Sequence, residues 1–167
     1  LGCSVYSNTL VVSVINYPTP TISAYGSTAI CSGNAVLLST NTFAGVSYQW
    51  ERNGTNIAGA TAQSYNATLA GTYRVTHTAN GCSKKSPALS VTVSAGPSAS
   101  ITANGSTQLC NGQTVTLNVA VVSGATYQWI KDGSIINGAT TTSYVANASG
   151  TYQCRVTTSC TSTSNAI

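Results

Sequence analysis

The stretch YQWERNGTNIAGATAQSYNATLAGTY, from Tyr48 to Tyr73, returns in related form as YQWIKDGSIINGATTTSYVANASGTY, from Tyr127 to Tyr152. The two stretches lie 79 residues apart in a chain of 167 residues. A fixed period of this kind indicates tandem copies of one structural unit. The sequence therefore predicts two consecutive domains, 18–96 and 97–167, which we call the first repeat and the second repeat.

Residues 1–17 look like the end of a further repeat. Gly2-Cys3-Ser4 matches Gly81-Cys82-Ser83, and the alternating Leu10, Val12 and Val14 match a similar alternation that begins at Leu89. Alternation of this kind is typical of a half-buried strand. We therefore expect residues 1–17 to be the last strand of a preceding repeat. Ile167 aligns near Leu89, so the second repeat is expected to lack most of its own final strand.

Short alternating segments separated by turn signals predict an all-β fold. Asn53-Gly54 and Asp132-Gly133 interrupt the pattern at equivalent places, and both dipeptides suit the two positive φ angles of a type I′ hairpin turn. Turn signals every 8–12 residues are typical of a β-sandwich. We expect tandem β-sandwiches of about seven antiparallel strands each. Short links that contain Pro18 and Pro97 favour a rod-like arrangement.

The charge pattern excludes several classes of function. Charged residues make up 5% of the chain, and the net charge of +4 comes from six scattered cations. A nucleic-acid surface needs clustered cations, so we expect no nucleic-acid partner. No apolar run approaches the ~18–20 residues of a membrane-spanning helix, so we expect no direct membrane insertion.

The six cysteines indicate an oxidising compartment. Their spacing predicts disulfides from Cys31 to Cys82 and from Cys110 to Cys160, each closing a loop of about 50 residues and contributing about 4 kcal/mol in the chain-entropy model. Cys3 would pair with a preceding repeat. Cys154 is expected to be a buried free thiol, with a bridge to Cys110 or Cys160 as the alternative.

The ordered motifs Cys-x-Gly, Tyr-Gln-Trp, Asn/Asp-Gly, Gly-Ala-Thr, Gly-Thr-Tyr and a later Cys resemble immunoglobulin-like repeats of Bacteroidota cell-surface adhesins, gliding adhesins among them, that leave the cell by the type IX route. The resemblance implies that Trp50 and Trp129 are core tryptophans, and that Tyr73 and Tyr152 hold the tyrosine-corner position. It also implies an extracellular location, either on the bacterial outer membrane or secreted. Tyr152-Gln153-Cys154 has the antibody spacing, but the position of its expected partner holds Leu117 or Val119.

Catalytic and metal-binding residues are scarce. Glu51 and Asp132 are the two carboxylates, and they fall in different repeats. Neither a carboxylate pair for hydrolysis nor a calcium site of the usual kind is expected. His77 is the one histidine, and we expect it to be an ordinary surface or edge residue. We predict that the chain is not an enzyme, binds no metal and needs no cofactor.

Aromatic residues that do not recur are candidates for contacts with other molecules. Repeated aromatics are explained by the core, but the following four have no aromatic counterpart: Tyr6, Tyr17, Tyr25 and Phe43. Exposed tyrosines suit glycan or protein ligands, and packing across a domain junction is the other interpretation.

These observations predict a stalk or adhesin segment of a large extracellular bacterial protein, whose partners include the neighbouring repeats of its own chain. One alternative is a subunit of a self-associating filament completed by strand exchange, in which the orphan strand 1–17 completes a neighbour. Another is a carbohydrate-binding module of a secreted protein.

Overall fold

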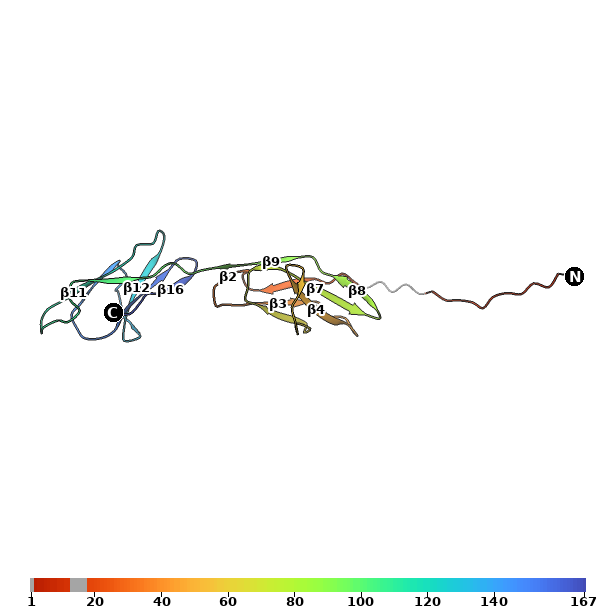
Figure 1. Cartoon of the computed structure of the whole chain (residues 1–167), viewed down its shortest axis with the longest axis horizontal. Coiled ribbons are helices and arrows are strands. Elements are labelled where there is room, and N and C mark those ends of the chain that lie inside the picture. Colours follow the sequence, from red (N-terminus) through yellow and green to blue (C-terminus); the bar gives the residue numbers. More distant parts are fainter. Residues whose placement is uncertain (1, 13–17) are drawn as a thin grey trace. The chain divides into compact units, whose positions relative to one another are not determined.

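The computed structural model describes residues 2–12 and 18–167 of the chain, and this part contains sixteen β-strands and no helix (Figure 1). The strands of the first repeat are β1 Ile22–Tyr25, β2 Ala29–Cys31, β3 Val36–Thr40, β4 Ser47–Arg52, β5 Thr55–Asn56, β6 Ser64–Ala67, β7 Gly71–Ala79, β8 Cys82–Lys85 and β9 Leu89–Ser94. Those of the second are β10 Ile101–Asn104, β11 Val115–Val119, β12 Thr126–Lys131, β13 Ser134–Ile135, β14 Ser143–Ala146, β15 Tyr152–Thr157 and β16 Thr161–Thr163.

The strand order of the first repeat is that of an immunoglobulin-like sandwich. One sheet has the order β1-β3-β6 and the other the order β2-β9-β7-β4-β5, with β8 also pairing with β7. The consecutive strands β1 and β2 thus lie in different sheets, and β2 runs parallel to β9. Neighbouring strands come from distant parts of the chain, as the Greek-key connections of this fold require.

The second repeat has the same plan with a shorter second sheet. Its sheets have the orders β10-β11-β14 and β13-β12-β15-β16. The burial patterns of β12 and β14 are identical to those of β4 and β6. The predicted all-β, immunoglobulin-like sandwich is confirmed, with β4–β7 and β12–β15 as antiparallel pairs and β2–β9 as a parallel pair.

The core of the second repeat lies between its two sheets. Buried side chains from β10, β11 and β14 meet those of β12 and β15 in one cluster, with Trp129 fully buried at its centre. The Trp129 indole donates a hydrogen bond to the Thr141 carbonyl at 2.9 Å, and the Trp50 indole donates to the Ala62 carbonyl at 2.9 Å. A buried indole N–H thus keeps a partner in each repeat.

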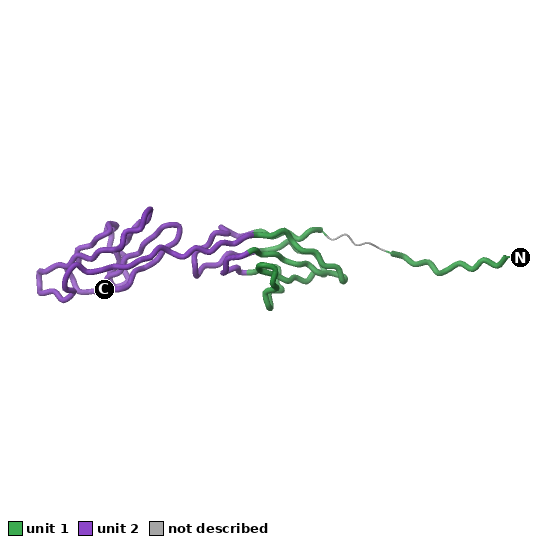
Figure 2. Tube along the Cα trace, turned by 45° about the horizontal axis from the view of Figure 1, so that its top comes forward, with its two compact units in different colours: residues 1–23, 39–65, 72–89 green, residues 24–38, 66–71, 90–167 purple. Residues whose placement is uncertain are grey.

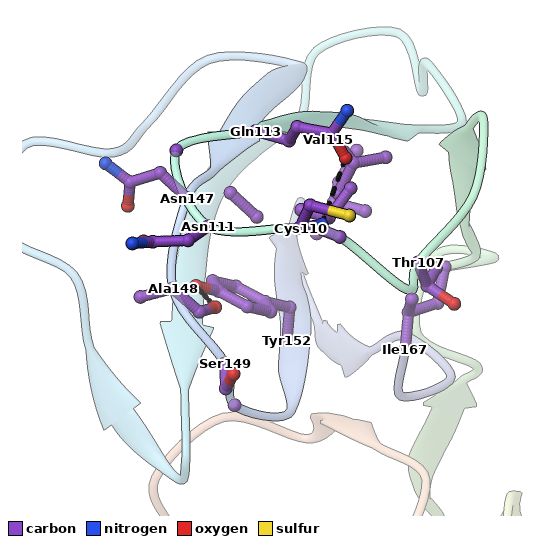
Figure 3. A pocket seen from close by; sticks show the side chains of 15 residues that line it. Thr107, Cys110, Asn111, Gln113, Val115, Asn147, Ala148, Ser149, Tyr152 and Ile167 are labelled. Atoms are coloured by element: carbon purple, nitrogen blue, oxygen red, sulfur yellow. Dashed lines mark hydrogen bonds between the residues drawn. The ribbon is translucent and has the colours of Figure 1, made fainter.

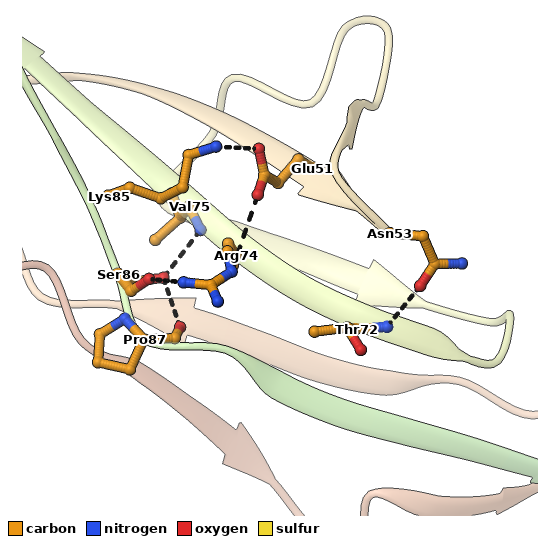
Figure 4. Close-up of polar contacts among 8 residues, drawn as sticks. All are labelled: Glu51, Asn53, Thr72, Arg74, Val75, Lys85, Ser86 and Pro87. Atoms are coloured by element: carbon orange, nitrogen blue, oxygen red, sulfur yellow. Dashed lines mark hydrogen bonds and ion pairs between the residues drawn. The ribbon is translucent and has the colours of Figure 1, made fainter.

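The predicted hairpin turns are confirmed. Asn53 and Asp132 both have a φ of 51°, and Gly54 and Gly133 follow with φ of 81° and 78°. The Asn53 side chain accepts a hydrogen bond from the Thr72 N–H at 2.8 Å, which ties the β4–β5 turn to β7 (Figure 4). A short polar side chain is needed here because it both tolerates positive φ and reaches the neighbouring strand.

The described chain divides into two compact units (Figure 2). One unit contains residues 1–23, 39–65 and 72–89, and the other contains residues 24–38, 66–71 and 90–167. The boundary at 96/97 stays a prediction, as does the assignment of residues 1–17 to a preceding repeat.

Residues 2–12 form no strand in this structure, and their large apolar side chains are exposed. Val5, Leu10 and Val12 are 93%, 84% and 79% exposed. A strand is held by hydrogen bonds to a neighbouring strand. The alternation in this segment is therefore not accompanied by strand pairing in this structure. No helix in the described part of the chain is long and apolar enough to cross a membrane.

Candidate functional site

Cys31 and Cys160 form a disulfide that joins the first repeat to the second. Their Cα atoms lie 5.7 Å apart, and 129 residues of sequence separate them. Cys31 ends β2, and Cys160 immediately precedes β16. The bond therefore fastens the last residue of a strand in one repeat to a turn in the next.

This disulfide corrects the predicted pairings of Cys31 with Cys82 and of Cys110 with Cys160. Cys82 and Cys110 are both free and exposed. The reason is that Cys160, which immediately precedes β16, is already bonded to Cys31 of the other repeat, whereas Cys110 lies in the loop at the rim of a groove that Ile167 also lines.

The remaining two cysteines are also free, Cys3 exposed and Cys154 buried. Cys154 lies in the core cluster with Trp129 and Leu117, where it acts as a small apolar residue. Burial raises the pKa of its thiol, although a backbone hydrogen bond from Gln128 lowers it in part. The expectation of a buried free thiol is met.

A groove of about 560 Å³ opens in the second repeat (Figure 3). Val115 and Leu117 of β11, Ala146 of β14 and Tyr152 of β15 contribute to its walls, and the loop around Cys110 forms its rim. The Tyr152 hydroxyl donates a hydrogen bond to the Ala148 carbonyl at 2.8 Å, four residues upstream. This is the geometry of a tyrosine corner, and it keeps the polar end of Tyr152 occupied beside the groove.

Ile167 lines the groove and holds the position of Leu89, the first residue of β9. It exchanges two backbone hydrogen bonds with Tyr152, of 2.7 and 3.0 Å, which keep it beside β15.

The segment at the rim of the groove differs in conformation from the equivalent segment of the first repeat. Residues 29–31 form β2, which pairs in parallel with β9, whereas their counterparts 108–110 form no strand. Leu109 is 37% exposed, and the equivalent Ile30 is 8% exposed. The rim of the groove thus lacks the strand that the first repeat forms at this place. The lining is mixed, with Asn111, Gln113 and Asn147 beside the apolar side chains of Val115 and Leu117.

An ion cluster with a buried carboxylate and two half-exposed cations lies on β4, β7 and β8 (Figure 4). Glu51 is 4% exposed, its carboxylate accepts a hydrogen bond from Lys85 Nζ at 2.6 Å, and Arg74 Nε lies 4.0 Å away. Arg74 also donates to the Ser86 carbonyl at 2.9 Å. The cluster thereby links β8 to β7 and β4 of the same sheet. The sequence shows Glu51 as one of two carboxylates, but it does not show which cations face it.

His77 is buried and does not lie at the surface as expected. It is 6% exposed and lies against the rings of Phe43 and Tyr48, at centroid distances of 6.0 and 4.9 Å. Its Nε2 is 2.9 Å from Thr40 Oγ1, and no described residue hydrogen-bonds its Nδ1. Burial lowers the pKa of His77, so that the neutral form is favoured. Its inward position on β7 could have been read from the alternation, since Tyr73 and Val75 share that face.

The residues proposed from sequence for contacts and for the core lie as follows. Tyr6 and Tyr25 are 91% and 70% exposed, Phe43 is half-buried beside His77, and Tyr17 lies outside the described residues. Trp50, Trp129, Tyr73 and Tyr152 are all buried. Among the described residues, no group of three or more acids, cysteines or histidines is arranged to hold a metal ion.

The chain matches no protein-family model and no curated protein. Similar solved structures include the human OSCAR ligand-binding domain, at 17% identity and a TM-score of 0.37, covering 90% of this chain and 97% of that one. Murine CEACAM1b is similar at 16% identity and a TM-score of 0.39, covering 89% of this chain and 97% of that one. The assignment of the fold rests on the strand order described above and not on these similarities.

Proposed function

We propose that this chain is a non-enzymatic, extracellular stalk or adhesin segment of a large bacterial surface protein, of the kind that the motif resemblance to Bacteroidota repeats implies. The observation that carries the proposal is the Cys31–Cys160 disulfide, because it ties one repeat to the next. A stalk transmits tension along its repeats. A covalent bond between repeats carries that tension itself, so the chain between the two bonded cysteines bears none of it. Exposed aromatics such as Tyr25 then serve protein or glycan ligands.

Single-molecule pulling from the two ends of the chain tests this role. In the oxidised protein, the chain between Cys31 and Cys160, whose sequence separation is 129, stays shielded from tension, and reduction releases roughly 430 Å of additional contour at ~3.3 Å per residue. The variant C31S should behave like the reduced protein. The variant C3S, which removes an exposed free thiol, is the matched control and should keep the short contour. Equal contour lengths for the oxidised and reduced protein would overturn the proposal.

A second candidate function is a self-assembling extracellular filament completed by strand exchange, and the exposed apolar side chains of Val5, Leu10 and Val12 favour it. In such a filament each molecule supplies an extended strand to the next, so assembly depends on concentration. Electron microscopy of the oxidised protein over a range of concentrations tests it. Growth into fibres supports the filament, and a constant monomer at every concentration contradicts it.

A further inference from the structure

We propose that the outer face of the sheet β1-β3-β6 binds an uncharged glycan. The site consists of the side chains of Tyr25, Leu37 and Asn66, which we call the outer row. The ring of Tyr25 stacks on a sugar ring, and the amide of Asn66 hydrogen-bonds sugar hydroxyls. The inference rests on the first proposed function, in which exposed aromatic side chains meet ligands, and it names the ligand class and the residues that bind it.

The outer row crosses all three strands of its sheet. In the second repeat, the equivalent residues pair across the strands, with Asn104 opposite Thr116 and Thr116 opposite Val145. The strands of the two sheets correspond residue for residue at the offset of 79. The hydrogen bond from the Thr40 N–H to the Gln63 carbonyl, at 3.1 Å, agrees with this register for β3 and β6. Neighbouring strands lie ~4.8 Å apart, so the outer row spans roughly 10 Å.

The side chains of the outer row face solvent on a rigid support. Tyr25 is 70% exposed, Leu37 is 37% exposed and Asn66 is exposed, whereas the adjacent Leu38 and Ala67 are fully buried. No described residue hydrogen-bonds the Tyr25 hydroxyl or the side-chain amide of Asn66. The outer row therefore offers a ligand one aromatic ring, one aliphatic side chain, and an amide that both donates and accepts hydrogen bonds.

Charged residues are separated from this face in both repeats. The strands β1, β3 and β6 contain no charged residue, and neither do their counterparts β10, β11 and β14. The six cations and two acids of the chain lie on strands of the other sheets or in the turn that follows β12. A charged ligand on the outer row would lose hydration without gaining an opposite charge. An uncharged ligand is therefore favoured.

A sugar fits the outer row better than a protein surface does. A pyranose ring has an apolar face of C–H groups, which suits an exposed aromatic ring, and a rim of hydroxyls, which suits an amide. A stable protein–protein interface buries about 800 Å² on each partner and is enriched in aromatic and Arg side chains at its centre. One aromatic ring beside one leucine and one amide is a smaller surface than such an interface needs.

The fold does not require the residues of the outer row. The second repeat forms the same three-stranded sheet with other residues at these positions: Asn104, Thr116 and Val145. An exposed aromatic side chain such as Tyr25 buries little surface, so it contributes little to packing. The second repeat thus supplies replacements for the outer row that are compatible with the fold.

The test is an NMR titration of the whole oxidised chain, read from the backbone amides of the outer row. The probes are linear hexasaccharides of glucose, mannose and galactose, with oligogalacturonate as the acidic counterpart of the last. At least one neutral probe should shift these amides with a dissociation constant of about 1 mM or lower. Oligogalacturonate should bind there at least about tenfold more weakly. No shift with any neutral probe, or equal binding of the acidic one, would overturn the proposal.

Two substitutions copied from the second repeat test the residues of the site. Tyr25→Asn and Leu37→Thr should each weaken binding of the neutral probe, Tyr25→Asn by at least about tenfold, with the thermal unfolding temperature unchanged. Ile135→Asn is the matched control, because it removes an apolar side chain that is 52% exposed on the other kind of sheet. It should bind like the unsubstituted chain. Unchanged binding by Tyr25→Asn, or an equal loss in Ile135→Asn, would contradict the site.

The reverse exchange tests whether the outer row is sufficient. A chain with Asn104→Tyr, Thr116→Leu and Val145→Asn carries the same three side chains on the sheet β10-β11-β14. It should bind two molecules of the neutral probe, and the amides of β10 and β11 should shift with those of β1 and β3. A stoichiometry of one in a folded variant would contradict the sufficiency of the three side chains and overturn the proposal.

Failure of this site and failure of the stalk are distinguishable, because the pulling experiment depends on the disulfide and the titration depends on the outer row. If reduction lengthens the contour but no neutral probe binds, the stalk stands and the glycan site is wrong. If a probe binds at the outer row but oxidised and reduced contours are equal, the site stands and the stalk is wrong.

Discussion

Glu51 and Ile130 occupy the same position in the two repeats, and both are buried, at 4% and 6% exposure. Glu51 is paired with Lys85 and Arg74, whereas the counterparts of these cations in the second repeat are Thr163 and Gln153. One fold position thus tolerates either a paired charge or an apolar side chain. Each repeat is therefore a natural control for substitutions in the other.

Replacing Glu51 should separate the cost of breaking the ion cluster from that of losing a carboxylate. Glu51→Ala leaves a small cavity and removes the acceptor of the Lys85 hydrogen bond, and it should lower the free energy of unfolding of the first repeat by about 2 kcal/mol. Glu51→Ile fills the space as the second repeat does, and should cost under about 1 kcal/mol. Urea unfolding measures both, and a larger loss for Glu51→Ile than for Glu51→Ala would contradict this account.

His77 should make the stability of the first repeat fall in mildly acidic solution. Burial lowers the pKa of His77 below its ordinary value of 6.5, so below pH 6.5 the unfolded chain binds a proton that the folded chain refuses. The stability that depends on neutral His77 is fully present above pH 6.5, and it is lost progressively as the pH falls below that value. His77→Val copies Val156 of the second repeat and should flatten the profile. Urea unfolding between about pH 7.5 and pH 5.5 tests this, and an unchanged slope in His77→Val would refute it.

The ionisation of Asp132 should affect the stability of the second repeat only in more acidic solution. The Thr151 N–H, and after it Lys131, hold the pKa of the Asp132 carboxyl below its ordinary value of 3.8. Its contribution is present above pH 3.8 and is lost as the pH falls through the lower pKa of the folded state. Asp132→Asn copies Asn53 and should remove this dependence. Hydrogen exchange of the Thr151 amide should quicken in acid, beyond the intrinsic pH effect, in the unsubstituted protein alone.

Gly96 should be intolerant of any side chain. A Cβ at this position would collide with Ser162 Oγ and lie 3.0 Å from the Thr161 carbonyl oxygen. Gly96→Ala should therefore lower the free energy of unfolding by about 1–3 kcal/mol, since the backbone of Thr161 must move. Adding Ser162→Ala relieves the contact with the hydroxyl, and should recover part of the loss. Thermal unfolding of the single and double variants checks this, and no recovery in the double variant would contradict it.

Local chemistry made the fold predictable from sequence. The Asn53-Gly54 and Asp132-Gly133 turns are set by neighbouring residues, and the alternation on β3 and β11 follows from one buried face. Each signal acts within a few residues, and the second repeat supplied an independent copy of each.

The disulfide pairing was not predictable in the same way. In a periodic sequence, a bond between two positions of one repeat and a bond between the same positions of successive repeats leave the same cysteine pattern. Only the three-dimensional path of the edge strand separates Cys31–Cys82 from Cys31–Cys160. The cations facing Glu51 are likewise brought together by strand pairing, over distances in sequence that no local pattern covers.

The Cys31–Cys160 bond also bears on how such a chain can lengthen by gene duplication. A bond within a repeat would make each new repeat covalently self-sufficient at once. A bond that reaches into the following repeat means that an inserted repeat takes over one cysteine partner from each neighbour and offers one in return. Every junction between two repeats then carries one disulfide, whatever the number of repeats. A repeat that lacks either cysteine would leave a neighbour with an unpaired thiol.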